Sequence, residues 1–370
     1  MLYLFLLGRD PELSKLEIES VFERLKIKFQ IIESGKHVAV VDCDKLNPRI
    51  INEFGGIINI AEVISSSDRL DQIEEALNKA DIYNGTSNKI EYFIDHFSTD
   101  LTSFLEDYLK DYFKSIKVKA LYKKQGEPSR IFEKLQLGKT LNFVVFKSYI
   151  GKVFSITNPK EFKMRDDVRP NVDFLKVISI RLAKILVNLS KAKENQILLD
   201  PFCGSGTILQ EAMLKGIKVI GVDNDKEAMK QSKDNLEWLK GTYKLNVDFK
   251  LIEANVIDLA KEIKKVDAVV TEPYMGPYIR KLPNVLEGRK LVIELSNLYN
   301  DLMKNLKDII KTNGRLVIII PTIRTRENKK LFINFNDIIE KNGFNLINNP
   351  IEYNYRKSKI LRQIYVLERL

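Results

Sequence analysis

The stretch from Gln196 to Asp223, QILLDPFCGSGTILQEAMLKGIKVIGVD, constrains the fold more than any other part of the chain. It begins with an apolar run without alternation, which is typical of a strand buried on both faces of a parallel sheet. A turn of small residues follows, then apolar residues at helical spacing from Thr207 to Leu214, and Gly216 stands where such a helix would end. A second strand, Lys218–Val222, leads to Asp223. This order predicts a nucleotide-binding βαβ unit, whose ligand lies at the carboxyl ends of the strands.

The residues of the turn distinguish between nucleotides. A dinucleotide site needs a third glycine at the position where Leu209 stands. A P-loop needs a lysine directly after its last glycine, but no lysine follows Gly206. Instead, Asp200 closes the first strand, and Asp223 closes the second strand 23 residues later. Two carboxylates suit a ligand with an ammonium group and a ribose diol but no phosphate, and S-adenosylmethionine is such a ligand. The alternative is that the glycines form only a tight turn and that Asp223 is only a strand-end acid.

The residues expected to bind this cofactor follow three successive strands. The asparagine after the third strand is expected to accept a hydrogen bond from the adenine amino group, although an asparagine that only forms a turn would look the same. The expected set is Asp200, Phe202, Gly204, Gly206 and Thr207 after the first strand, Asp223 and Asn224 after the second, and Asn255 and Val256 after the third.

A second motif, Glu272-Pro273-Tyr274, follows a predicted strand at Ala268–Val270. An exocyclic amine is a poor nucleophile because its lone pair is delocalised into the ring. A carboxylate on Glu272 and the carbonyl of Pro273 would accept both amino hydrogens and favour a pyramidal nitrogen placed for methyl transfer. Tyr274 would stack on a base that has left its helix. These three are the expected catalytic residues, although a tripeptide of this kind also occurs by chance.

A net charge of +10 and a pI near 9.2 favour a polyanionic partner. Clustered cations with an aromatic among them suit a phosphate backbone, although a solvated lysine face has the same composition. Two arginines near residue 167 could instead clamp the cofactor or pin a linker by ion pairs. The residues expected to contact RNA are Lys119, Lys123, Lys124, Arg130, Arg165, Arg169 and Lys357.

Cysteine and histidine are scarce, with two of each. Two cysteines form no disulfide framework, and the four residues together do not suggest a metal site, so we expect no metal and a reducing, cytoplasmic environment. The longest aliphatic run, Leu316–Ile320, is far too short to cross a bilayer, so no membrane partner is expected.

Several motifs together resemble those of the THUMP-type tRNA guanine-N2 methyltransferases. DPFCGSGTIL resembles motif I of this family, RDDVRP resembles its linker, and VDAVVTEPYMGP resembles its Asp-Pro-Pro-Tyr motif. MLYLFLLGRDPELSKLEIESVF and GGIINIAEVI resemble its N-terminal ferredoxin-like module. The resemblance implies an α/β, Rossmann-like, seven-stranded class I methyltransferase domain at 161–370, with a linker at 161–173. It also implies α+β modules before that domain: a ferredoxin-like module at 1–54 and a THUMP-type RNA-binding domain at 55–160 that grips the tRNA acceptor end.

The activity implied by the resemblance is S-adenosylmethionine-dependent methylation of N2 of a guanine in tRNA, at position 10. The chain departs from the family in having Glu272, Pro273, Tyr274 and Met275 where the family has aspartate, two prolines and tyrosine. The acid is one methylene longer and the aromatic comes one position early. Two alternatives to methylation at position 10 therefore remain. The target is another guanine of tRNA, or the protein binds tRNA and its methyltransferase fold is catalytically silent. DNA amino-methyltransferases share the motifs, but many place the proline motif first and they lack the front modules.

Elements that flank the motifs are also predicted. Residues 157–173 are expected to be an irregular polar connector, followed by a helix at Phe174–Leu189. Strands at Arg315–Pro321 and Gln363–Leu367 are expected to complete the seven-stranded sheet.

Overall fold

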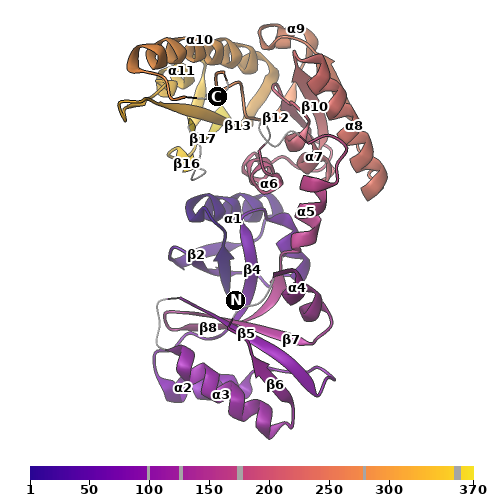
Figure 1. The fold of residues 1–370 in the computed structure, drawn as a ribbon, viewed down its shortest axis with the longest axis vertical. Helices are drawn as coiled ribbons and strands as arrows, with labels where there is room; N and C mark the ends of the chain where they lie inside the picture. Colours follow the sequence, from indigo (N-terminus) through magenta and orange to yellow (C-terminus); the bar gives the residue numbers. More distant parts are fainter. Residues whose placement is uncertain (98–100, 125–127, 173–177, 278–280, 354–359) are drawn as a thin grey trace. The chain divides into compact units, whose positions relative to one another are not determined.

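The computed structural model describes residues 1–97, 101–124, 128–172, 178–277, 281–353 and 360–370. The chain forms two compact units, Met1–Lys163 and Met164–Leu370 (Figure 1). Among the described residues, no helix combines the length and the apolar character that a membrane crossing requires.

The first unit is built on one eight-stranded sheet with the order β2-β3-β1-β4-β8-β7-β5-β6. Neighbouring strands are antiparallel, except that β5 runs parallel to both β6 and β7. The strands are β1 (Leu2–Leu7), β2 (Phe29–Ser34), β3 (Val38–Cys43), β4 (Ile57–Ser65), β5 (Lys89–Phe97), β6 (Lys119–Tyr122), β7 (Thr140–Phe146) and β8 (Tyr149–Ile156). The helices are α1 (Pro11–Leu25), the 3-10 helix η1 (Pro48–Glu53), α2 (Leu70–Lys79), α3 (Leu101–Ser115) and α4 (Pro128–Gln136).

Apolar faces of three helices cover this sheet. Helix α1 buries Ile18 and Phe22 against strands β1, β3 and β4, and the rings of Phe22 and Phe5 meet edge to face at 5.9 Å. Helices α2 and α3 contribute Leu77 and Leu109 to a second cluster with β5, β7 and β8. The helical spacing of these residues in the sequence therefore corresponds to the faces that pack on the sheet.

A buried carboxylate fixes the turn that precedes β4. Glu17 of α1 is fully buried, and its two oxygens accept the N–H groups of Gly55 and Gly56 at 2.8 Å each. Strand β4 then pairs with β1 on one side and β8 on the other. The expected boundary between residues 54 and 55 falls in this turn, between strands β3 and β4 of the same sheet.

The second unit contains a nine-stranded sheet whose main path has the order β11-β10-β9-β12-β13-β17-β15, while β14 pairs with β13 and β16 with β17. Numbered along the chain, this path reads 3-2-1-4-5-7-6. Strands β9 to β13 are parallel, and β17 is antiparallel to its neighbours. The expected Rossmann-like α/β fold with seven principal strands is confirmed. The strands are β9 (Ile197–Asp200), β10 (Lys218–Asp223), β11 (Phe249–Glu253), β12 (Val266–Thr271), β13 (Ile310–Arg324), β14 (Lys330–Leu331), β15 (Phe344–Leu346), β16 (Ile351–Tyr353) and β17 (Ile360–Arg369).

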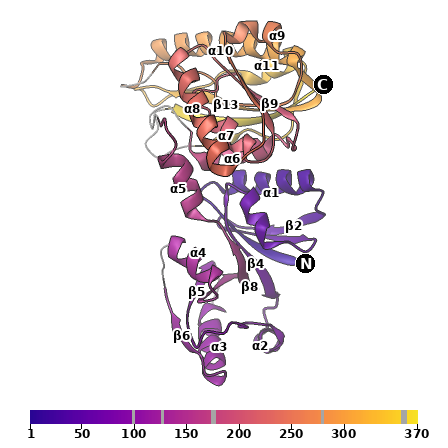
Figure 2. The ribbon, with the colours of Figure 1, turned by 90° about the vertical axis from the view of Figure 1, so that its right-hand side faces the viewer.

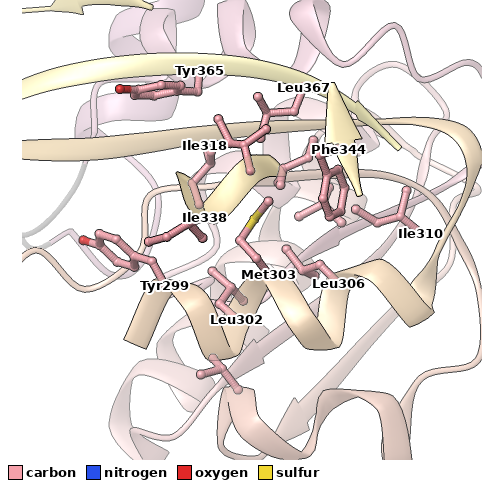
Figure 3. Packing of buried hydrophobic residues seen from close by; sticks show 14 of the residues in the cluster. Tyr299, Leu302, Met303, Leu306, Ile310, Ile318, Ile338, Phe344, Tyr365 and Leu367 are labelled. Atoms are coloured by element: carbon pink, nitrogen blue, oxygen red, sulfur yellow. The ribbon is translucent and has the colours of Figure 1, made fainter. Parts of the chain in front are cut away.

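Helices cover both faces of this sheet, as Figure 2 shows. Helices α9 (Leu259–Glu262), α10 (Val285–Ile309) and α11 (Phe335–Lys341) lie on one face, and α6 (Ile180–Leu189), α7 (Thr207–Met213) and α8 (Lys226–Tyr243) lie on the other. Figure 3 shows how Leu302 and Met303 of α10 pack against Ile318 of β13 and Leu367 of β17. Burial on both faces explains why the strands read as continuous apolar runs.

Two predicted elements differ from the structure. The expected irregular connector contains helix α5 (Pro159–Asp167), which begins where Asn158 Oδ1 accepts the N–H of Lys160 at 3.1 Å. An asparagine followed by proline is a helix start, but few apolar residues follow it, so the helical period is weak. Of the helix expected at Phe174–Leu189, residues 174–177 lie outside the described residues. Residues 178 and 179 are not helical, and α6 begins at Ile180, where Ser179 caps it by accepting the N–H of Leu182.

Candidate active site

The glycine turn after β9 forms one wall of the candidate site. Gly204 and Gly206 have φ values of +50° and +84°, in the left-handed region that favours glycine. A Cβ on Gly206 would lie 2.6 Å from Ser232 Oγ, so this glycine permits close packing on α8. A Cβ on Gly204 would meet nothing within 4 Å, so the turn is open on that side. The turn therefore offers backbone to a ligand at Gly204 and packs tightly at Gly206.

Asp223 connects the end of β10 to this turn. Its Oδ2 accepts the N–H of Gly204 at 2.9 Å, and its Oδ1 accepts the N–H of Asp225 at 3.0 Å. The half-buried carboxylate thus lies beside the open side of the turn. An acid in this place of a βαβ unit is suited to a ribose diol.

Asp200 connects the ends of β9 and β12. Its Oδ1 accepts hydrogen bonds from the N–H of Phe202 at 3.1 Å and from Thr271 Oγ1 at 2.8 Å, and its side chain is almost fully buried. Burial raises the pKa of Asp200 to about 7, the two hydrogen bonds oppose this rise, and the charges of Asp223 and Glu272 add to it. Asp200 therefore interacts electrostatically with both other carboxylates at one edge of the sheet.

The remaining predicted cofactor residues occupy distinct environments. Phe202 packs against the core, and Thr207 is buried in the first turn of α7. Asn224 is exposed beyond β10. Asn255 is exposed, and its Oδ1 accepts the N–H of Ile257 at 3.2 Å, where η2 (Val256–Asp258) begins. Val256 belongs to the core, so its side chain supports the loop rather than facing a ligand.

Glu272 follows β12 and is held by an arginine that sequence reasoning did not pair with it. Its Oε1 accepts a hydrogen bond from Arg362 Nε of β17 at 2.8 Å, and 16% of its side chain is exposed. Burial raises the pKa of Glu272, and the charge and hydrogen bond of Arg362 oppose that rise. Pro273 is buried, and among the described residues no donor contacts its carbonyl oxygen.

A buried tyrosine holds the backbone of this corner. The hydroxyl of Tyr299, in α10, donates to the carbonyl oxygen of Tyr274 at 2.8 Å. The ring of Tyr299 is fully buried, whereas 45% of Tyr274 is exposed. Tyr274 therefore presents its ring to solvent from an anchored backbone. Tyr299 was not predicted, since its place within a long amphipathic helix identifies it only as a core residue.

The two arginines of the predicted linker lie inside the second unit. Arg165 Nε donates to Glu211 Oε1 at 2.7 Å, and Arg169 donates to Thr207 Oγ1 at 2.8 Å. Each arginine is only 4% exposed. Neither has the exposure that a contact with RNA phosphate needs, so the structure agrees with the alternative that they pin this segment to the fold.

A buried asparagine adds to this attachment. Asn235 of α8 exchanges two hydrogen bonds with the backbone of Asn171, at 2.9 and 3.0 Å, and also donates to the carbonyl of Ser205 at 2.9 Å. The segment before the sheet is therefore bonded to the glycine turn of the candidate site.

The other predicted RNA contacts lie in different places. Lys119 and Lys124 are exposed and Lys123 is half-buried, all on or beside β6 at the edge of the first sheet. Tyr122, which lies among them, is half-buried, stacks on Tyr92 at 5.3 Å and packs against the core. Arg130 lies in α4, and Lys357 lies outside the described residues.

Comparison with known proteins adds to this geometry. Residues 176–344 match a family model described as RMKL-like, methyltransferase domain, and residues 71–234 match a model described as DNA methylase, a range that ends before β12. The tRNA (guanine(10)-N2)-dimethyltransferase of Methanothermobacter thermautotrophicus is 28% identical over 272 residues, which are 72% of this chain and 75% of that protein.

A probable tRNA (guanine(10)-N2)-dimethyltransferase of Methanothermococcus thermolithotrophicus is 32% identical over 139 residues, which are 37% of this chain and 77% of that protein. The chain belongs to this family of tRNA guanine-N2 methyltransferases. The crystal structure of TrmN from Thermus thermophilus has the same fold, with a TM-score of 0.55 and 15% identity over the whole of both chains. The cofactor of this methyltransferase is therefore S-adenosylmethionine, and the open turn at Gly204 beside Asp223 fits a ligand of that kind.

Proposed function

We propose that this methyltransferase modifies N2 of guanine 10 in tRNA, and that residues 55–160 act as a THUMP-type RNA-binding domain. The observation that carries the proposal is the position of Glu272. It follows β12, the strand next to β9, and its charge acts on Asp200 at the end of β9. An acceptor for an amine thus lies at the same sheet edge as the carboxylates expected at the cofactor site.

The chain's own groups prepare the amine. Bound S-adenosylmethionine supplies a methyl group on a sulfonium ion. Glu272 accepts one amino hydrogen of the guanine through the oxygen that Arg362 does not hold, and the carbonyl of Pro273 accepts the other. These contacts draw the nitrogen lone pair out of conjugation and fix its direction, because hydrogen-bond acceptors placed before the reaction need no reorganisation during it. When the new N–C bond forms, Glu272 is placed to take the proton that the amine loses.

Exposed groups support the choice of an RNA base as substrate. Tyr274 is nearly half exposed and its backbone is anchored, so its ring can stack on a base taken out of its helix. The net charge of +10 and the exposed lysines Lys119 and Lys124 favour a phosphate backbone. The names of the relatives provide the position in tRNA that we propose.

The test is methyl transfer to unmodified tRNA made by transcription. The protein is incubated with methyl-labelled cofactor and tRNA, and the product is digested and mapped by mass spectrometry. We expect N2-methylated guanine at position 10, no label in a transcript with adenine at that position, and loss of turnover without loss of cofactor affinity in Glu272→Gln. Label at another guanine would replace the proposed position, and tRNA binding without label would favour a silent fold. The mass of the product separates one methyl group from two.

We also propose that the protein works in the cytoplasm. Its two cysteines are unpaired and buried, which suits a reducing compartment. Localisation of a tagged protein by cell fractionation tests this proposal.

A further inference from the structure

The Glu272–Arg362 pair joins segments that are 90 residues apart in the sequence. Arg362 pairs with Pro321 in the antiparallel ladder of β13 and β17, and β13 lies between β17 and β12. The guanidinium therefore reaches past one strand to the corner after β12. The pair is largely buried, with 27% of Arg362 and 16% of Glu272 exposed, so solvent screens it only in part.

We propose that Arg362 is a positioning residue, which fixes one oxygen of Glu272 so that the other faces the amine of the target base. This inference rests on the proposed function. Glutamate places its carboxylate one bond, about 1.5 Å, further from the backbone than the aspartate in the family motif and adds one rotatable bond. A hydrogen bond from Arg362 Nε removes that freedom, because a charge-assisted bond on Oε1 defines where Oε2 points.

Charge gives Arg362 a second effect on the same carboxylate. Glu272 shares the sheet edge with Asp200 of β9 and Asp223 of β10, and the neutral hydroxyl of Tyr299 approaches from α10. Burial disfavours the ionised form of Glu272, and Arg362 is the cation that opposes this. Glu272 must be ionised to take the proton that the amine loses, and the ionised form is also the stronger acceptor for an amino hydrogen, so the arginine extends activity toward lower pH.

The chain offers a closely matched control for this pair. Lys311 donates to Asp267 Oδ1 at 2.6 Å, and Asp267 lies near the start of β12, at the opposite end of the strand from Glu272. Asp267 is 15% exposed, nearly the same as Glu272. Lys311→Met therefore removes one positive charge from an equally buried carboxylate in the same unit, but away from the candidate site.

The experiment compares Arg362→Met, Arg362→Lys and Lys311→Met in single-turnover and steady-state methylation of tRNA from pH 5.5 to 8.5. For Arg362→Met we expect kcat to fall about 100-fold, the cost typical of a misplacement of about 1 Å. The KM for tRNA and the Kd for the cofactor should change less than about threefold, and the acid limb of the kcat profile should move up by about one pH unit or more. Arg362→Lys should recover part of kcat and of the pH profile, and Lys311→Met should match wild type.

A measurement that needs no turnover separates this inference from the proposed function. The carboxyl carbon of Glu272 is followed by NMR in protein labelled with ¹³C-glutamate, and its signal is assigned by its absence in Glu272→Gln. Its titration midpoint should rise in Arg362→Met and stay in place in Lys311→Met. An unchanged midpoint, or a raised KM for tRNA with normal kcat, overturns the positioning role and in the second case makes Arg362 an RNA contact. A wild-type protein that transfers no methyl group contradicts the proposed function, while the titration still decides the role of Arg362.

Discussion

Replacing Asp200 by asparagine should change how the stability of the methyltransferase unit depends on pH. The side chain is 1% exposed, and its Oδ1 accepts from Phe202 and Thr271. Asparagine has nearly the same shape and keeps an oxygen acceptor for both donors, but it carries no charge at any pH. The substitution therefore isolates the cost of ionising this buried carboxyl.

The magnitude follows from the pKa. Burial raises the pKa of Asp200 from 3.8 to about 7, so the folded state favours the protonated carboxyl. The protonated carboxyl of Asp200 contributes its full stabilisation below the pKa that this group has in the unfolded chain. This stabilisation is lost as the pH rises from that value to about 7. At about 1.4 kcal/mol for each pH unit, the total loss is about 4 kcal/mol, of which about 3 kcal/mol falls between pH 5 and 8.

The assay is urea unfolding of wild type and Asp200→Asn at pH 5, 6, 7 and 8. Trp238 is the only tryptophan of the chain and lies in α8, so its fluorescence reports on the methyltransferase unit. The stability of Asp200→Asn relative to wild type should rise by about 3 kcal/mol from pH 5 to pH 8. Asp248→Asn removes an exposed carboxylate from the same unit and should run parallel to wild type. Parallel curves for Asp200→Asn as well would refute the reasoning.

Three further outcomes follow from the contacts of the site. Below pH 7, cofactor affinity should increase by up to about tenfold for each unit by which the pH is raised, because we expect the ammonium group of the cofactor to bind ionised Asp200. Calorimetry in buffers of different ionisation enthalpy should accordingly show proton release on binding, and Asp200→Asn should show none. Tyr299→Phe should lower stability by about 1 to 2 kcal/mol and reduce kcat, since the carbonyl of Tyr274 loses its donor, and an unchanged kcat in single turnover would contradict this anchoring role. Arg165→Met should cost about 3 to 5 kcal/mol in urea unfolding because Glu211 is left buried and unpaired, whereas the double variant with Glu211→Leu should recover most of that loss.

The parallel half of the sheet was predictable because its signals are local. The run at Ile197–Asp200 has no alternation, and the change to helical spacing at Thr207 marks the helix. Both strand and helix are decided within a few residues, and the carboxyl ends of adjacent parallel strands must share an edge. The positions of Asp200, Asp223 and Glu272 along that edge follow from the same rule.

Contacts between distant segments were not predictable. Residues 355–362 form a basic run, YRKSKILR, in which nothing shows that Arg362 and not a neighbouring cation reaches Glu272, because the pairing of β17 with β13 decides it. The roles of Arg165 and Arg169 could not be predicted for the same reason, because their partners are distant in the sequence. Arg165 and its partner Glu211 are 46 residues apart, so the sequence alone does not show whether the guanidinium faces phosphate or the interior. Helix α5 was missed for a different reason, since its start signal at Asn158 is local but its apolar period is weak.

The carboxyl edge of the sheet combines two requirements that oppose each other. A cationic methyl donor is favoured by negative charge, yet burial raises the pKa of both Asp200 and Glu272, and the charges of Asp223 and Glu272 raise the pKa of Asp200 further. The structure balances these requirements with different donors: backbone N–H groups at Asp223, a hydroxyl and an N–H at Asp200, and a guanidinium at Glu272. Of these three acids, and within the described part of the chain, Glu272 is the one hydrogen-bonded to a fully charged partner, and it is the acid that we propose accepts from the amine. Arg362 therefore opposes, with a full charge, the rise that burial causes in the pKa of Glu272, whereas at Asp200 only a hydroxyl and an N–H oppose that rise.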